Sequence, residues 1–175
     1  MGPYRAAALS LLLSAQAVAQ TPGWQFSPLP GEGDRAAMGC DRDSTAADFA
    51  CVVVRCEDDY STGLHLFSNR TPNALGTWKL TLDREDRTIE VIPDIAPYSG
   101  RVATETDWLL DRLKQGSYIY LRHSADENAP FRFISLAGSF AAIHEALYWC
   151  APRVSPTEQN AETGVETTNE LGEKP

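Results

Sequence analysis

The chain has 175 residues, with 24 acidic and 15 basic side chains and a formal net charge of -9 at pH 7. This acidity disfavours contact with phosphate backbones, and because the basic residues are scattered rather than clustered, we expect no nucleic-acid partner. The length favours a single domain with a hydrophobic core of its own.

The first 19 residues have the three parts of a secretory signal peptide. Arg5 lies in a basic start, residues 6–13 are apolar, and Ala17 and Ala19 form an A-x-A cleavage site before Gln20. The apolar stretch is shorter than the roughly 20 residues of a membrane-spanning helix, and no later stretch is long and apolar enough to span. We therefore expect cleavage after residue 19 and a mature protein that is periplasmic or secreted.

Two segments of the mature chain differ in composition from a packed domain. Residues 20–35 are rich in proline and glycine, which favours an extended N-terminal arm, with Trp24 and Phe26 placed to attach it to the domain. Residues 151–175 contain almost no large apolar side chain and are expected to form a disordered acidic tail. The sequence between them, 36–150, is the expected single β-rich domain.

The first half of this domain has the pattern of β-strands. Residues 49–56 form a run rich in β-branched side chains, and residues 64–68 follow after a polar turn. Apolar residues then alternate with polar ones over 78–82 and again over 89–91, with a charged turn at 83–87. Such alternation predicts a hairpin with one buried face and one exposed face.

A short helix and two further strands are predicted next. Thr104 stands three residues before Asp107, which resembles a capping box at the start of a helix that ends at Gly116. Leu109, Leu110 and Leu113 give this helix an apolar stripe, and strands are expected over 118–122 and 131–136.

The last predicted element is a helix that begins at Ser139 as its N-cap and ends at Cys150, because Pro152 cannot continue it. Four residues at positions i, i+3, i+7 and i+10 lie on one stripe of this helix, which should face the sheet. They are Phe140, Ile143, Leu147 and Cys150.

Four cysteines in an exported chain predict two disulfides. Alternation along 49–56 puts Cys51 and Cys56 on opposite faces, about 16 Å apart at about 3.3 Å per residue, which is too far for a bond. Together with an inward-facing Cys150, this favours Cys40 with Cys51 and Cys56 with Cys150. The alternative pairs Cys51 with Cys150 and Cys40 with Cys56, and it applies if a bulge exchanges the two faces of the strand.

No motif in the sequence predicts catalysis, a metal site or a cofactor. The residues around Ser139 lack the second glycine of a nucleophile elbow, and His144 is not followed by the second histidine of a zinc protease motif. His65 and His123 have no identifiable partner, and the acids at 57–59 lack the spacing of a calcium loop and indicate a solvated turn. The cysteines have no zinc-finger spacing.

Three aromatic residues form the candidate partner surface. Tyr118 and Tyr120 lie opposite the apolar face of their strand, and Trp149 lies opposite the apolar stripe of its helix. Such side chains either bind a protein partner or are covered by the N-terminal arm or another part of the sheet.

Residues 110–146 resemble the C-terminal half of the invasion-associated locus B family. The resemblance rests on the leucine-rich helix that ends in Lys114-Gln115-Gly116, on the strand and turn that follow, and on residues 133–147, Phe-Ile-Ser-Leu-Ala-Gly-Ser-Phe-Ala-Ala-Ile-His-Glu-Ala-Leu. It implies an exported bacterial protein with a β-sandwich-like core, a periplasmic location and no established catalytic residue. The N-terminal half departs from the family pattern.

The sequence thus predicts a mainly β, α+β fold: an antiparallel β-sandwich or a curled sheet with two packed helices, stapled by disulfides. The predicted function is that of an exported, non-enzymatic binding or accessory protein that acts by contact with an unidentified protein. One alternative is an inhibitor of a lysozyme-like cell-wall hydrolase, since acidic domains suit basic targets. Another is a hydrolase whose residues meet only in space.

Overall fold

The computed structural model describes residues 22–26, 35–69, 74–94, 98 and 100–150. The predicted signal peptide, much of the predicted arm and the predicted tail lie outside the described residues, as does the side chain of Trp149.

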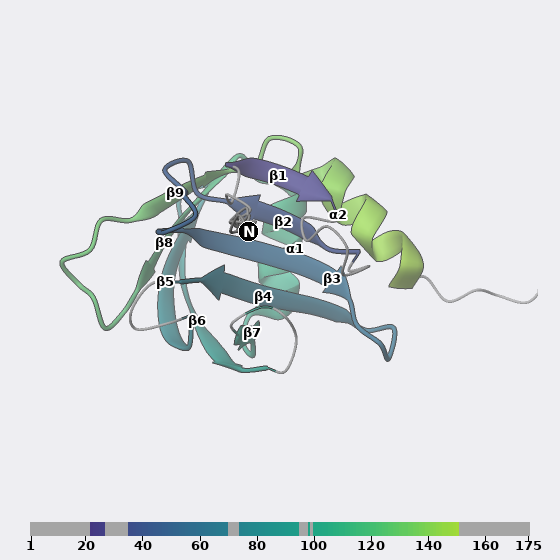
Figure 1. Cartoon of the computed structure of the whole chain (residues 1–175), viewed down its shortest axis with the longest axis horizontal. Helices are drawn as coiled ribbons and strands as arrows, with labels where there is room; N and C mark the ends of the chain where they lie inside the picture. The colour runs from purple at the N-terminus through teal and green to yellow at the C-terminus, as the bar shows by residue number, and fades with distance from the viewer. Residues whose placement is uncertain (1–21, 27–34, 70–73, 95–97, 99, 151–175) are drawn as a thin grey trace, which may run out of the picture.

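Nine antiparallel strands form one sheet in the order β1-β2-β3-β4-β7-β6-β5-β8-β9, which curls until its two edges approach each other (Figure 1). The strands are β1 (Gly23–Phe26), β2 (Ala37–Cys40), β3 (Ala50–Cys56), β4 (Thr62–Ser68), β5 (Gly76–Leu82), β6 (Glu85–Pro93), β7 (Gly100–Val102), β8 (Tyr118–His123) and β9 (Arg132–Ser135). The mainly β fold with two helices is confirmed, and of the two predicted arrangements the structure has the curled sheet.

The described part of the predicted arm belongs to this sheet. β1 pairs with β2 and places Trp24 opposite Gly39. A side chain at Gly39 would clash with the indole ring of Trp24, so the missing Cβ is what lets the ring lie against the strand. Trp24 and Phe26 pack against the core, as predicted.

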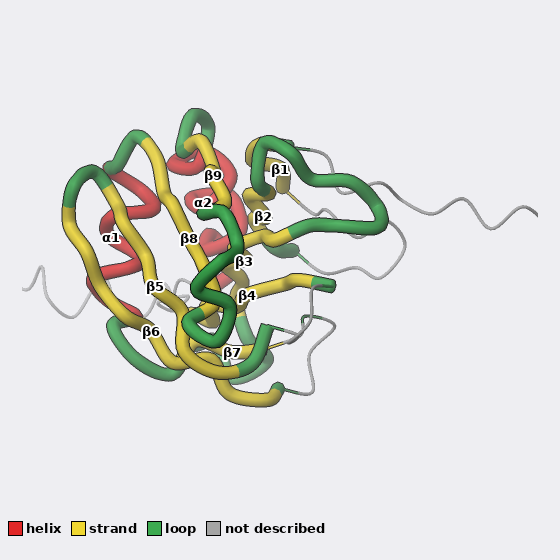
Figure 2. The backbone as a smooth tube through the Cα atoms, turned by 90° about the vertical axis from the view of Figure 1, so that its left-hand side faces the viewer, coloured by secondary structure: helices red, strands yellow, loops and turns green. Residues whose placement is uncertain are grey.

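Hydrophobic residues pack on both faces of β3. Val52 and Val54 belong to the main core on the inner face of the sheet, which the two helices cover, whereas Cys51 and Val53 belong to a smaller cluster on the outer face. This is the alternation predicted for residues 49–56. In Figure 2, which views the molecule from the side of β5, β8 and β9, the helices lie behind the strands.

The β5–β6 hairpin is confirmed, but its turn is shorter than the predicted 83–87. β6 begins at Glu85, and Asp83 and Arg84 form the turn with φ values of 45° and 82°. Such left-handed conformations suit two-residue hairpin turns. The carboxylate of Asp83 also accepts the backbone N–H of Ser117 at 3.0 Å, which joins this turn to the segment after the first helix.

Helix α1 (Thr106–Gln115) ends at Gly116, as predicted, but the predicted capping box is wrong. Glu105 occupies the N-cap position without a side-chain hydrogen bond. The hydroxyl of Thr104 instead accepts the backbone N–H of Glu90 at 2.9 Å, because β6 lies within reach of it. Leu109 and Leu113 are fully buried, which confirms most of the apolar stripe.

Helix α2 (Ser139–Leu147) continues into the short 3-10 helix η1 (Tyr148–Cys150), and two predictions about it are wrong. The N-cap residue is Gly138, whose φ of 85° suits glycine, whereas the hydroxyl of Ser139 is buried within 2.7 Å of the carbonyl oxygens of Leu113 and Leu136. Ile143 faces the core but Phe140 is 61% exposed.

The small residues of α2 explain why Phe140 faces solvent and not the core. Its buried face consists of Ser139, Ala142, Ile143 and Ala146, so the helix approaches the sheet through short side chains. The ring of Phe140 lies about 100° around the helix from Ser139 and points to solvent.

The structure joins Cys40 to Cys51 and Cys56 to Cys150, which is the predicted pairing. Cys40 and Cys51 are directly opposite each other in β2 and β3, and both belong to the outer-face cluster. Cys56, at the end of β3, reaches η1 on the other side of the sheet. The alternative pairing is wrong because Cys51 faces away from the helices.

The two disulfides should contribute unequally to stability. Replacing both Cys56 and Cys150 by serine opens a loop whose ends are 94 residues apart, so the free energy of unfolding should fall by about 4 to 5 kcal/mol. Replacing both Cys40 and Cys51 by serine opens a loop whose ends are 11 residues apart, and the free energy of unfolding should fall by about 3 kcal/mol. Denaturant unfolding of both double variants measures the two losses, and a larger loss for the Cys40 and Cys51 variant would contradict this order.

Candidate functional site

The two edges of the curled sheet meet where β9 lies beside β1 and β2. The backbone N–H of Arg42, just after β2, donates to the carbonyl of Phe133 in β9 at 2.9 Å. The indole N–H of Trp24 in β1 donates to the carbonyl of Ser135 at 3.0 Å. We call this boundary, with the loop that joins β2 to β3, the seam.

A buried carboxylate organises the loop on one side of the seam. Asp41 is fully buried and accepts hydrogen bonds from the backbone N–H of Ala50 at 2.9 Å and from the hydroxyl of Ser44 at 2.8 Å. It also accepts the backbone N–H of Asp43 at 3.1 Å. These bonds replace the water that a carboxylate requires when it is buried.

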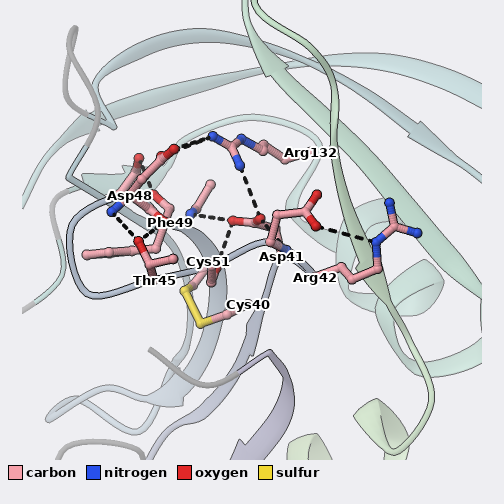
Figure 3. Close-up of polar contacts among 12 residues, drawn as sticks. Cys40, Asp41, Arg42, Thr45, Asp48, Phe49, Cys51 and Arg132 are labelled. Carbon is pink, nitrogen blue, oxygen red and sulfur yellow. Dashed lines mark hydrogen bonds and ion pairs between the residues drawn. A yellow bond between two sulfur atoms is a disulfide. The ribbon is translucent and has the colours of Figure 1, made fainter. Parts of the chain in front are cut away.

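Arg132 of β9 crosses the seam to this loop. Its side chain is only 11% exposed, and its Nη1 lies 3.4 Å from Oδ1 of Asp41. Its Nη2 lies 2.8 Å and 3.0 Å from the two carboxylate oxygens of Asp48 (Figure 3). One guanidinium therefore binds two acids of the β2–β3 loop and fixes β9 against it.

The seam also positions the side chain of Arg42, the residue after Asp41. Because the backbone of Arg42 is bonded to Phe133, its guanidinium carbon lies 5.3 Å from the centre of the Phe133 ring. A guanidinium at this distance interacts favourably with the face of an aromatic ring.

Aromatic rings gather on the outer face of β8 and β9. The ring centres of Tyr120 and Phe133 are 5.3 Å apart, and those of Tyr118 and Tyr120 are 5.4 Å apart. Phe131, directly before β9, carries the guanidinium of Arg122 at 4.3 Å from its ring centre. We define the aromatic surface by these four rings and the two arginines stacked on them: Tyr118, Tyr120, Phe131, Phe133, Arg42 and Arg122.

Strand alternation explains why these rings face outward. Ile119, Leu121 and Ile134 are each next to one of these rings in sequence, point to the opposite face and are fully buried in the core. The register aligns Thr81, Tyr120 and Phe133 in one row across β5, β8 and β9. The same strands thus form the core with one face and the aromatic surface with the other.

The structure brings two of the three predicted surface residues together. Tyr118 and Tyr120 are neighbours, and Tyr120 is 38% exposed. Trp149 lies on a different element, η1, and its side chain is outside the described residues. Sequence reasoning missed Phe133 and Arg42, since only the β8–β9 register and the seam bring them to the tyrosines.

His65 has partners that the sequence did not reveal. Its ring is fully buried, with Nε2 2.7 Å from Oε1 of Glu57 and Nδ1 3.6 Å from Oδ2 of Asp94. Glu57 is therefore a largely buried partner of His65 and not part of a solvated turn. Asp58 and Asp59 are exposed as predicted, and hydrogen bonds from the hydroxyl and backbone N–H of Ser61 lower the pKa of Asp59.

The other polar candidates have structural contacts. His123 donates from Nε2 to the carbonyl of Leu75 at 2.7 Å and accepts the backbone N–H of Ala125 at Nδ1, which is the pattern of a neutral ring. His144 is exposed and stacks on Phe140. The buried hydroxyl of Ser139, bonded to backbone carbonyls, is inaccessible to a substrate.

Within the described ranges, no three histidine, cysteine or acidic side chains converge on a point where a metal ion could bind. The described helices are also too short or too polar to cross a bilayer.

Comparisons of this chain with protein-family models, with curated proteins and with solved structures gave no match. The resemblance to the invasion-associated locus B family therefore stays a prediction.

The seam should depend much more on Arg132 than on Asp48. Arg132→Met leaves the buried carboxylate of Asp41 without its cation, and the free energy of unfolding should fall by about 3 kcal/mol. Asp48 is 43% exposed, so Asp48→Asn should cost less than about 1 kcal/mol. Denaturant unfolding of the two variants at pH 7 tests this, and equal losses would show that the buried pair has no special role.

Proposed function

We propose that this chain is an exported, non-enzymatic binding or accessory protein, which acts by contact with a protein partner through the aromatic surface. The observation that carries the proposal is the cluster of outward-facing rings on β8 and β9, with a guanidinium stacked on each phenylalanine. Tyrosine, phenylalanine and arginine are among the side chains that are enriched where proteins bind one another.

The rigidity of the site supports this proposal. The rings of Tyr118, Tyr120 and Phe133 are on paired strands whose inward apolar residues are fully buried, so their positions are fixed before a partner binds. Binding then costs less conformational entropy than it would for rings on a mobile loop. The two disulfides are compatible with a protein that works outside the cytoplasm, where disulfides persist.

The proposal agrees with what the resemblance to the invasion-associated locus B family implies, namely export and no catalytic residue. Inhibition of a basic lysozyme-like enzyme would need an acidic contact surface. Arg42 and Arg122 make the aromatic surface unsuited to such a target, so we do not assign that function to it.

Site-specific photocross-linking in cells of the native host tests the proposal. A benzophenone side chain in place of Tyr120 should give a discrete covalent adduct with a protein partner. The same side chain in place of Tyr60, which is 73% exposed in the β3–β4 turn, is the matched control and should not give that adduct. Adding Phe133→Ala to the Tyr120 photoprobe should reduce the adduct, because it removes the neighbouring ring.

Each cross-linking chain must first show the circular dichroism and intact disulfides of the unmodified protein. A lack of adducts from position 120, or the same adducts from positions 120 and 60, would contradict a partner surface on β8 and β9.

A further inference from the structure

We infer that the partner binds the aromatic surface through an acidic segment, in which carboxylates flank an aromatic or aliphatic side chain. This inference rests on the proposed function, since it specifies the chemistry of the partner at the same surface.

The charges on this face of the sheet differ in sign from the charge of the chain. Only two of the outward positions on β5, β8 and β9 are charged, Lys79 and Arg122, and both are cations. These outward positions are Thr77, Lys79, Thr81, Tyr118, Tyr120, Arg122, Phe133 and Ser135. Arg42 adds a third cation from the seam. Although the chain has a net charge of -9, the strip of outward strand positions beside the rings thus carries cations and no acid, with Asp43, Asp86 and Glu127 at its border.

The acids that border this strip are bound weakly. Arg42 lies 3.7 Å from Asp43 and Lys79 lies 3.5 Å from Glu127, in pairs whose acidic side chains are largely exposed. Exposed ion pairs contribute little to stability, so carboxylates of a partner can replace them at low cost. Asp86, on the next strand, accepts the hydroxyl of Thr81 at 2.6 Å.

Both arginines are oriented by the rings beneath them. Arg122 lies over Phe131 and Arg42 over Phe133, at 4.3 Å and 5.3 Å from the ring centres. A guanidinium that stacks through its face keeps N–H groups along its edge for a carboxylate. In Arg122, Nη1 donates to the carbonyl oxygen of Glu127 at 2.8 Å, so a carboxylate of the partner would bind at Nη2. Because Phe133 is in β9 and Phe131 lies only two residues before it, the two cations are close enough for one short peptide segment to contact both.

A hollow next to these cations offers space for the apolar side chain of such a segment. It has a volume of about 540 Å³ and adjoins Phe131 on the outer face of β5 and β6. Phe131 supplies an exposed apolar wall, and Lys79, Arg87 and the acid Asp86 line the same hollow. An apolar anchor between carboxylates matches this arrangement of ring, space and cations.

Single-stranded nucleic acids also bind aromatic and cationic sheet faces. The net negative charge of this chain opposes the approach of a polyanion more strongly than that of a peptide with two or three carboxylates. The observations therefore favour an acidic peptide, and an oligonucleotide serves as a separate arm of the test.

The test selects binders from a displayed library of random peptides, with the purified, disulfide-bonded mature chain as the target. Enriched peptides should contain two or more aspartates or glutamates around an aromatic or aliphatic residue. Synthetic copies should bind about tenfold more weakly to Arg42→Gln and to Arg122→Gln, as expected for the loss of one charge-assisted contact. Lys114→Gln on α1 is the charge-matched control and should leave the affinity unchanged.

Tyr120→Ala separates failure of this inference from failure of the proposed function. Enriched peptides that depend on Tyr120 but are neutral or basic would overturn the inference and leave the proposed function intact. No enrichment, or acidic peptides that ignore Arg42, Arg122 and Tyr120, would also overturn it. Tyr120-dependent binding of an oligothymidine of 12 nucleotides that is tighter than that of any enriched peptide would overturn both.

Discussion

A buried ion pair between Asp41 and Arg132 spans the place where the curled sheet comes closest to closing. Nine strands arranged in one sheet leave two edges, and unpaired edges expose backbone groups to water and to other chains. Here the edge at β9 is attached to the opposite side by a guanidinium that binds two acids of the β2–β3 loop. Because Asp41 is fully buried and already bonded to its own loop, the loop and β9 form one unit. Arg42 follows Asp41 in sequence and Phe133 follows Arg132, so we expect the position of Arg42 over Phe133, and hence one end of the aromatic surface, to depend on that unit.

Core and partner surface are two faces of the same strands. On β8 and β9 the inward residues Ile119 and Ile134 are fully buried, while their sequence neighbours Tyr120 and Phe133 face outward. The burial that stabilises the domain therefore also holds the rings in place. The Cys56–Cys150 disulfide also stiffens this scaffold, from the side of the helices, since it attaches the end of the last helical segment to β3. A rigid scaffold of this kind suits a protein that recognises a partner without rearranging.

Local periodicity predicted most of the fold, and long-range pairing accounts for what it missed. Alternation along residues 49–56 placed Cys51 and Cys56 on opposite faces and, together with an inward-facing Cys150, favoured the disulfide pairing that the structure has. It also placed Tyr118 and Tyr120 on an outward face. It could not show that Phe133 lies beside Tyr120, or that Glu57 lies beside His65, because those contacts depend on strand register and on the path of loops. The N-cap at Ser139 failed since Gly138 adopts the left-handed conformation there, and Phe140 faces solvent because α2 packs through its small residues.

The ion pair across the seam should hold Arg42 against Phe133, and proton NMR of the Arg42 side chain measures this contact. In the unmodified protein the side-chain protons of Arg42 should be shifted upfield by the ring of Phe133. In Arg132→Met these protons should move to the values of an exposed arginine, while the methyl groups of the inner-face core keep their shifts. Unchanged Arg42 shifts in that variant, with the core intact, would contradict the account.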